Sequence, residues 1–252
     1  MIGIVSGAGP LAGFDVARKI IEETVAVTDQ EHLPVLVFSV PEEIPDRSSF
    51  LLGQIPDNPG RPIGELFLRL EQAGARIAAI ACNTAHAEPI FNEVRARLRA
   101  AESTLQVVNI IENTVDHIRA RFEPSTVRLG VLGTNGTHKL RLYSDPLRAA
   151  GYTVLAPNDQ EQKQVHGSIF NVEYGVKACS SPVDPRAVRD LEEIMDSLIE
   201  QGAELIVLGC TELPLAITAG SYRGIPLIDP NRLLARRLIK DFAPEKLRPE
   251  SS

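Results

Sequence analysis

Two cysteines, Cys82 and Cys210, each follow an apolar run and precede small polar residues. Cys82 is followed by Asn83 and Thr84, and Cys210 is followed by Thr211. Because Asn and Thr are favoured at helix N-caps, we expect each thiol to lie beside backbone N–H groups at the positive end of a helix. Such surroundings lower the pKa of a thiol from about 8.5 toward neutrality. Both cysteines are therefore predicted to supply thiolate.

Two thiols near one substrate carbon predict a different reaction from that of a single thiol. A single reactive thiol attacks as a nucleophile and normally needs a histidine base nearby. Two thiols on opposite sides of a carbon can remove a proton from one face and return a proton to the other, which inverts a stereocentre. Asn83, Thr84 and Thr211 are candidates to stabilise the carbanion through a carboxylate of the substrate. We expect this chemistry to need neither a cofactor nor a metal.

The segments that carry the two cysteines form an internal repeat. GARIAAIACNT (74–84) aligns with GAELIVLGCT (202–211) at an offset of 128 residues, and residues 2–10 align with residues 129–137 at an offset of 127. Two strand–loop units in the same order predict two similar lobes. Ligands of open parallel sheets bind beyond the carboxyl ends of the strands. A pseudo-twofold pair of lobes would therefore point both sulfur atoms at one cleft.

The elements around this repeat predict an α/β fold. Near-continuous apolar strands alternate with amphipathic stretches, which is typical of parallel sheets covered by helices on both faces. The predicted strands span 2–5, 35–40, 76–81, 106–110, 128–133, 153–157, 205–209 and 226–230. The predicted helices span 10–28, 63–73, 84–101, 112–121, 138–150, 185–201 and 231–242. Residues 41–62 contain five prolines and are predicted to be a long functional loop.

The first lobe is predicted to be discontinuous in sequence. PLIDP (226–230) and the last helix are expected to return to it, so the first lobe comprises residues 1–112 and 222–252. The second lobe comprises residues 113–221. Each lobe is expected to hold a central parallel sheet flanked by helices, with the active site in the cleft between the lobes. The segment from residue 244 onward is expected to be a frayed tail.

Composition excludes several classes of protein. The 252-residue chain is 44% hydrophobic and 23% charged, as in ordinary soluble globular proteins. Its formal net charge of −7 argues against a nucleic-acid partner, and no run reaches the roughly 20 apolar residues of a membrane helix. Three cysteines do not make a disulfide framework, and the first residues do not resemble a signal peptide. These features predict a cytoplasmic protein.

Eight short segments together resemble one known family. They are GPLA (9–12), DQEH (29–32), IPDR (44–47), CNTAH (82–86), GT-x-GT (133–137), the EQ…GVKA segment (161–178), GCTE (209–212) and IDP (228–230). In this order they resemble the aspartate/glutamate racemase family, and above all its aspartate racemase branch. The resemblance implies two four-stranded parallel lobes, a cofactor-independent two-base mechanism with Cys82 and Cys210, and a homodimer. It implies a small dicarboxylic amino acid as the substrate.

The resemblance also assigns two cations. Arg47 of IPDR and Lys177 of GVKA match the residues that hold the side-chain carboxylate of the substrate. Arg binds a carboxylate in a bidentate fork and Lys adds a point charge. Two departures bear on the substrate: Glu212 stands where glutamate racemases have His, which favours aspartate, and Ala8 replaces a bulkier residue, which leaves room for a β-substituted aspartate.

Five further residues are candidates for substrate binding. By resemblance, three polar residues after the cysteines surround the α-carboxylate and ammonium of the substrate: Asn83, Thr84 and Thr211. Thr134 and Thr137, in the second glycine loop, are further candidates, and their alternative role is to form a turn and a helix cap.

Other assignments remain open on the sequence alone. Residues 7–12 match the G-x-G-x-x-A pattern of dinucleotide-binding loops, although the acidic Glu31 precedes its strand instead of ending it. Cys82, His86 and Cys210 are possible zinc ligands, although a fourth ligand is not evident. A maleate isomerase-like or hydantoin racemase-like enzyme would use the same two cysteines. A non-enzymatic dicarboxylate sensor would need the binding residues but not two acid/base thiols.

Overall fold

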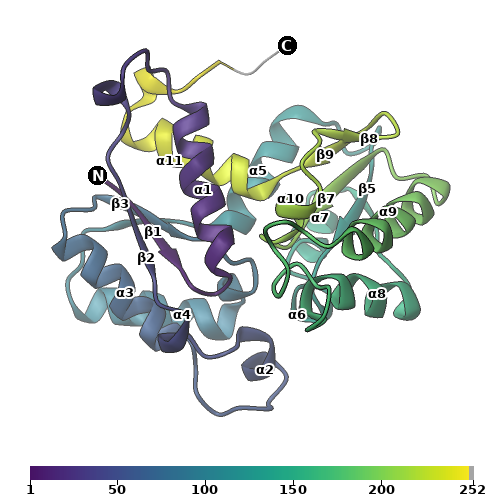
Figure 1. The fold of residues 1–252 in the computed structure, drawn as a ribbon, viewed down its shortest axis with the longest axis horizontal. Helices are drawn as coiled ribbons and strands as arrows, with labels where there is room; N and C mark the ends of the chain where they lie inside the picture. The colour runs from purple at the N-terminus through teal and green to yellow at the C-terminus, as the bar shows by residue number, and fades with distance from the viewer. Residues whose placement is uncertain (250–252) are drawn as a thin grey trace. The chain divides into compact units, whose positions relative to one another are not determined.

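The computed structural model describes residues 1–249 and divides into two compact units (Figure 1). Unit 1 consists of Met1–Asn113 and the chain from Asn231 onward, and unit 2 consists of Thr114–Pro230. Each unit has its own sheet. The predicted α/β fold with two lobes is therefore confirmed.

Unit 1 holds the first half of the repeat. Its strands are β1 (Ile2–Ser6), β2 (Val35–Ser39), β3 (Ile77–Ile80) and β4 (Gln106–Val108). Its α-helices are α1 (Pro10–Glu23), α2 (Arg47–Leu51), α3 (Gly60–Gln72) and α4 (Glu88–Ala100), with 3-10 turns at Asp29–Glu31, Pro41–Glu43, Thr84–His86 and Pro244–Lys246. Two helices, α5 (Ile110–Arg121) and α11 (Pro230–Phe242), include the points where the chain passes between the units.

Unit 2 holds the second half of the repeat. Its strands are β5 (Arg128–Leu132), β6 (Thr153–Leu155), β7 (Leu205–Leu208), β8 (Ser221–Tyr222) and β9 (Ile225–Ile228). Its helices are α6 (Asn135–Lys139), α7 (Ser144–Ala149), α8 (Asp159–Phe170), α9 (Pro185–Glu200) and α10 (Leu213–Ala216).

The two sheets repeat one topology. The first has the order β2-β1-β3-β4 and the second the order β6-β5-β7-β9-β8. In the first sheet Ile2 lies opposite Ile77, and in the second Leu129 lies opposite Leu205, which are the positions that the sequence repeat aligns. The first four strands of each order are parallel. The second sheet departs from the expected four strands because β8 adds a short antiparallel strand beside β9.

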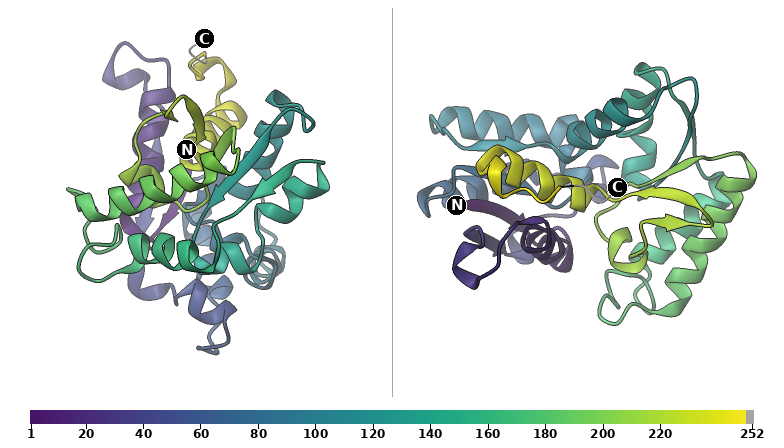
Figure 2. Two further views of the ribbon diagram at one scale, coloured as in Figure 1. Left: turned by 90° about the vertical axis from the view of Figure 1, so that its right-hand side faces the viewer. Right: turned by 90° about the horizontal axis from the view of Figure 1, so that it is seen from above.

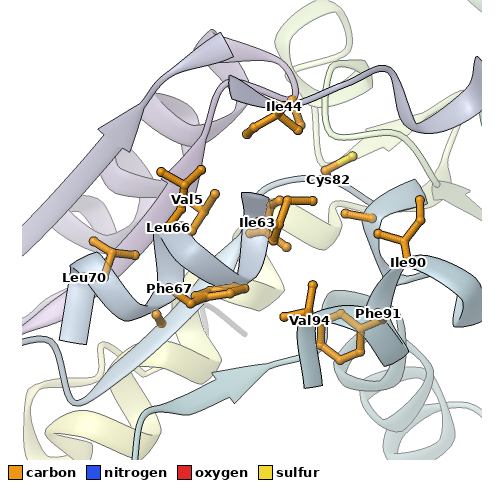
Figure 3. Packing of buried hydrophobic residues seen from close by; sticks show 14 of the residues in the cluster. Val5, Ile44, Ile63, Leu66, Phe67, Leu70, Cys82, Ile90, Phe91 and Val94 are labelled. Carbon is orange, nitrogen blue, oxygen red and sulfur yellow. The ribbon is translucent and has the colours of Figure 1, made fainter. Parts of the chain in front are cut away.

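Helices α3 and α4 pack on one face of the first sheet (Figure 3). Phe67 of α3 and Val94 of α4 belong to the same buried cluster as Val5 of β1. On the opposite face, α1 approaches β1 so closely that a Cβ at Gly13 would lie 2.3 Å from the Ser6 side chain. Burial on both faces explains why these strands have near-continuous apolar sequences.

Helices α8 and α9 lie side by side against the second sheet (Figures 1 and 2). Val165 of α8 and Leu191 of α9 share a buried cluster with Ile206 and Leu208 of β7. Leu205 and Val207, which point to the other face of β7, are also fully buried. β7 is therefore a central strand, and its carboxyl end is held rigidly from both faces.

The position of β9 corrects the predicted domain boundary. Residues 222–230 are predicted in the first lobe, but Leu227 of β9 pairs with Ile206 of β7, so this segment completes the second sheet. The chain returns to unit 1 only after Pro230. An apolar run identifies a strand from local residues, whereas the sheet that the strand joins depends on long-range pairing.

Two helical predictions also need correction. The single helix predicted over 138–150 is two helices, α6 and α7, with Arg141 between them at a φ of 50°. Helix α8 is absent from the prediction. It begins at a capping box in which the Asn158 side chain accepts from the N–H of Glu161 and the Glu161 side chain accepts from the N–H of Asn158.

The C-terminal segment is ordered as far as it is described, contrary to the expected frayed tail. The N–H of Arg248 donates to the carbonyl of Glu23 at 2.8 Å, and Leu247 forms a β-bridge with Thr24. The rest of that expectation, residues 250–252, lies outside the described residues. Among the described residues, no helix is both long and apolar enough to cross a bilayer.

A buried ion pair within α1 is hydrogen-bonded to α11, and the two helices lie side by side in Figures 1 and 2. The Asp15 carboxylate pairs with Lys19 Nζ at 2.6 Å and accepts from Asn231 Nδ2 at 2.8 Å and Arg18 at 2.7 Å. Burial by itself raises the pKa of Asp15, but the Lys19 charge and these hydrogen bonds together lower it below its ordinary value. The carboxylate therefore stabilises the fold at neutral pH, and this contribution is lost as the pH falls below the ordinary Asp value toward the lowered one.

Asp15→Asn is expected to lower the free energy of unfolding by about 3 to 5 kcal/mol near neutral pH, because the variant removes the carboxylate that pairs with the buried Lys19 charge. Urea unfolding measures the loss. The difference between variant and parent should shrink in acid, where Asp15 of the parent is itself protonated. Asp116→Asn is the matched control, because the exposed Asp116 carboxylate lies 3.9 Å from Arg119 and is expected to contribute less than about 1 kcal/mol. An equal cost for both variants would contradict a stabilising role of the buried pair.

Candidate active site

Cys82 lies two residues beyond the carboxyl end of β3, at the start of the Cys82 turn (residues 82–86). Its side chain is 6% exposed and belongs to the buried cluster that also contains Ala8 and Ile44. Figure 3 shows Cys82 and Ile44 on the same side of Ile63. The sulfur atom lies 3.3 Å from the Thr84 hydroxyl oxygen. A neutral hydroxyl is therefore the hydrogen-bond partner of this thiol.

The Cys82 turn does not form the helix cap that the sequence predicts. Thr84 begins a 3-10 turn, whereas α4 begins at Glu88 with Ala87 as its N-cap. Ala87 makes no side-chain capping hydrogen bond to α4. The side chains of Asn83 and Thr84 are nevertheless buried next to Cys82 in sequence.

His86 closes this turn. Its Nδ1 lies 2.9 Å from the backbone oxygen of Cys82, and its ring packs against Phe91. Burial is the main cause that lowers the pKa of His86 to about 4, so the ring is neutral at physiological pH. Within residues 1–249, no three His, Cys, Asp or Glu side chains gather in a way that could hold a metal ion.

Arg47 lies within the predicted loop 41–62, where it begins the short helix α2. Asp46 caps this helix by accepting from the Ser49 N–H at 2.7 Å. Arg47 is 7% exposed, and its guanidinium donates to the backbone oxygens of Ala8, Pro45 and Ile44. Because Ala8 and Ile44 share a cluster with Cys82, Arg47 belongs to the surroundings of that cysteine. Its Nε has no hydrogen-bond partner among the described residues.

The glycine loop before α1 does not have the features of a dinucleotide site. Gly9 is the N-cap of α1, and Pro10 follows at the first helical position. The acidic residues that a ribose would need, Asp29 and Glu31, form a 3-10 turn that precedes β2 instead of following it. Gly7 has a φ of 108° and lies against the backbone of Pro41, where a Cβ would come within 2.9 Å of the proline nitrogen.

Cys210 lies two residues beyond the carboxyl end of β7, in the Cys210 turn (residues 209–213). The N–H of Gly209 donates to the carbonyl of Leu132 at 2.7 Å, and a Cβ at Gly209 would lie 2.6 Å from that oxygen and 3.1 Å from the Tyr143 ring. Only glycine permits this approach. The Tyr143 ring and β5 therefore fix the position of the cysteine.

A carboxylate contacts the second thiol. Cys210 Sγ donates to Glu212 Oε2 at 3.0 Å, and the Thr211 hydroxyl donates to the same oxygen at 3.2 Å. The other carboxylate oxygen, Oε1, forms an ion pair with Lys177 Nζ. Lys177 Nζ also lies 5.3 Å from the centre of the Phe170 ring. The cation assigned to the substrate by resemblance thus shares a carboxylate with the thiol.

The expected low pKa of the thiols is wrong for Cys210. Burial and then the nearby Glu212 charge raise the pKa of this thiol well above its ordinary value, against the opposing effect of Lys177. Helix α10 after Cys210 has only four residues, and its N-cap residue makes no side-chain capping bond. No long helix therefore begins at Cys210 to lower the pKa of its thiol.

Thr134 and Thr137 take the alternative role considered for them. Thr134 is the N-cap of α6 and accepts from the Thr137 N–H at 3.3 Å. Both side chains are buried. The loop still lies close to the Cys210 turn, because a Cβ on Gly133 would be 3.1 Å from the carbonyl oxygen of Gly209.

Comparison with known proteins identifies the family. The sequence profile of the Asp/Glu/hydantoin racemases matches residues 5–238. The chain belongs to this family. The resemblance drawn from the eight motifs is thereby confirmed, and family membership supports an amino-acid racemase activity.

Relatives of this racemase-family chain cover it almost completely. It is 24% identical to a broad specificity amino-acid racemase of Bacillus subtilis, over 96% of the chain and 98% of the relative. Among solved structures, it is similar to an aspartate racemase of Picrophilus torridus, with 27% identity, a TM-score of 0.79, and coverage of 95% of this chain and 93% of that one. It is also similar to an aspartate racemase homologue of Pyrococcus horikoshii, with 26% identity, a TM-score of 0.66, and coverage of 95% and 97%.

The contact of Glu212 with Cys210 is the feature of this racemase-family chain that the sequence did not predict. The sequence marks Glu212 as a departure that bears on substrate preference, whereas the structure brings its carboxylate onto both Cys210 and Lys177. The internal repeat does indicate that Glu212 lies near the second cysteine. Glu212 aligns with Thr84, whose hydroxyl lies within hydrogen-bond distance of the Cys82 sulfur atom.

Proposed function

We propose that this protein is a cofactor-independent aspartate racemase that interconverts L- and D-aspartate, or a close dicarboxylic analogue, by proton transfer with Cys82 and Cys210. The observation that carries the proposal is the equivalence of the two cysteines. Each lies two residues beyond the carboxyl end of the third strand of its unit, and the residue before each donates its N–H to the neighbouring strand. Duplicated acid/base groups suit a reaction whose forward and reverse steps are mirror images.

In the proposed reaction, one thiolate takes the α-proton of the amino acid, so that a Cα–H bond breaks and an S–H bond forms. The other thiol then delivers its proton to the opposite face of the carbanion and becomes a thiolate. The intermediate needs donors at its α-carboxylate. Asn83, Thr84 and Thr211 are the proposed donors, since each is buried beside one of the cysteines.

The proposed preference for a dicarboxylate rests on two cations. Lys177 already binds one carboxylate, that of Glu212, and the buried Arg47 retains an Nε without a partner among the described residues. Arg and Lys recognise carboxylates through charge-assisted hydrogen bonds. The relationship to the Picrophilus torridus aspartate racemase supports aspartate among the possible dicarboxylic acids.

Deuterium exchange tests this function directly. With L-aspartate in heavy water and neither pyridoxal phosphate nor metal added, we expect deuterium at the α-carbon and formation of D-aspartate. Parallel reactions with L-glutamate and maleate, followed by chiral analysis, separate the related chemistries. Conversion of maleate without exchange into aspartate would favour an isomerase of the maleate type, and binding of dicarboxylates without any exchange would favour a sensor.

A further inference from the structure

The two cysteines differ in the group that contacts them. In the repeat, Thr84 and Glu212 occupy the same place, two residues after Cys82 and Cys210. Thr84 offers a hydroxyl at 3.3 Å from its sulfur atom, whereas Glu212 offers a carboxylate oxygen at 3.0 Å from its sulfur atom. The duplicated halves have therefore diverged at the position that contacts the thiol.

A carboxylate and a hydroxyl impose different protonation on a thiol. A hydroxyl can donate to a thiolate or accept from a thiol, whereas an ionised carboxylate can only accept. Glu212 is 4% exposed, so water screens its charge weakly. Its contact with Cys210 is favourable only while the sulfur atom carries a proton.

Other charged or titratable groups near Cys210 modulate this contact. Lys177 pairs with the far oxygen of Glu212 and opposes its effect on the thiol. Tyr143 lies beneath Gly209, and burial raises the pKa of its phenol, so it is neutral at physiological pH. Thr211 donates a second hydrogen bond to the oxygen that accepts from Cys210. After burial, Glu212 is therefore the group that most favours the protonated thiol, and Lys177 opposes its effect.

We propose that Glu212 is a positioning residue that keeps Cys210 protonated in the resting protein and directs its S–H bond, so that Cys210 enters the reaction as the proton donor. This inference rests on the proposed racemase function for its role in catalysis. When Cys210 gives its proton to the carbanion, the new thiolate lies beside the Glu212 carboxylate, which makes the thiolate a stronger base. To restore the resting state, Cys82 releases to solvent the proton that it took from the substrate and Cys210 takes one up, so that protons and charges balance.

The thiol of Cys210 can be titrated without any enzymatic turnover. Replacing Cys82 and Cys179 by serine leaves Cys210 as the only cysteine, and the ultraviolet absorbance of the thiolate then reports its titration. In this protein we expect an apparent thiol pKa above the ordinary value of about 8.5. Adding Glu212→Gln should lower it by about 1 to 3 units, since the change removes a like charge while keeping the side-chain length.

Two further variants make the test independent of any one substitution. Lys177→Met should shift the thiol pKa upward, because it removes the cation that opposes Glu212. Glu200→Gln, an exposed change on α9 in the same unit, should leave the titration unaltered. The proposal is overturned if Glu212→Gln leaves the titration unchanged, or if Lys177→Met shifts it downward.

The pH profile of racemisation gives the second readout. In the protein with all three cysteines, Glu212→Gln should move the pH dependence of kcat to lower pH, and Glu212→Asp should restore part of the original profile. If the protein does not racemise amino acids, the proposed function fails while the thiol titration still decides the role of Glu212. If racemisation occurs but the titration is unaffected by Glu212, only the present inference fails.

Discussion

Replacing either Cys82 or Cys210 by serine is expected to slow the racemisation of aspartate by about a thousandfold or more, because each change removes one of two acid/base groups. A serine hydroxyl keeps the size of the side chain but is a far weaker acid than a thiol. Each variant should still exchange the α-proton of one enantiomer, since the remaining thiol serves one face of the carbon. Chiral analysis and deuterium exchange, measured separately for L- and D-aspartate, distinguish loss of racemisation from loss of exchange.

Cys179→Ser is the matched control for these variants. Cys179 is partly exposed and its sulfur donates to the Glu173 carbonyl at 3.3 Å, away from both cysteine turns in sequence. It has no counterpart in the first half of the repeat. We expect wild-type racemisation from this variant. The two-base assignment is wrong if the Cys82 and Cys210 variants each retain the wild-type rate, or if one variant alone loses activity while the other is unaffected.

The strands were the most predictable part of the fold because the pattern that identifies them is local. A strand buried on both faces needs an apolar residue at nearly every position, and all eight predicted strands are present. The hydrophobic pattern did not predict helix α8, because its buried side carries polar Gln162 and Ser168 as well as Val165 and Ile169. Its start was visible instead as Asn158 followed three residues later by Glu161.

The site was predictable as a set of residues and not as a set of interactions. The repeat identified Cys82 and Cys210 from the sequence, because duplication preserves spacing. The charge state of Cys210 could not be derived in the same way, since it depends on Glu212 folding back toward the sulfur atom and on Lys177, 35 residues earlier in the chain. Helix-cap propensities predicted a lowered pKa for the Cys210 thiol, whereas burial and then the nearby Glu212 carboxylate raise it.

Arg47→Leu is expected to lower kcat/KM for aspartate by about a hundredfold or more, because truncating one partner of a buried charge pair costs about 2 to 5 kcal/mol. Under the proposed function, Arg47 holds the side-chain carboxylate of the substrate. Racemisation of alanine, which lacks that carboxylate, should change much less. Parallel kinetics with L-aspartate and L-alanine measure the difference.

The structure gives Arg47 a second role, which the same experiment must separate from substrate binding. Its guanidinium joins the loop before α2 to the carbonyl of Ala8, so Arg47→Leu is also expected to lower the free energy of unfolding by about 1 to 3 kcal/mol. Damage to the loop would slow aspartate and alanine equally, whereas loss of carboxylate recognition slows aspartate selectively. Arg61→Leu, at the exposed start of α3, controls for the loss of a positive charge and should affect neither substrate. Equal loss with both amino acids would assign Arg47 to loop architecture alone, and the substrate carboxylate would then require a different cation.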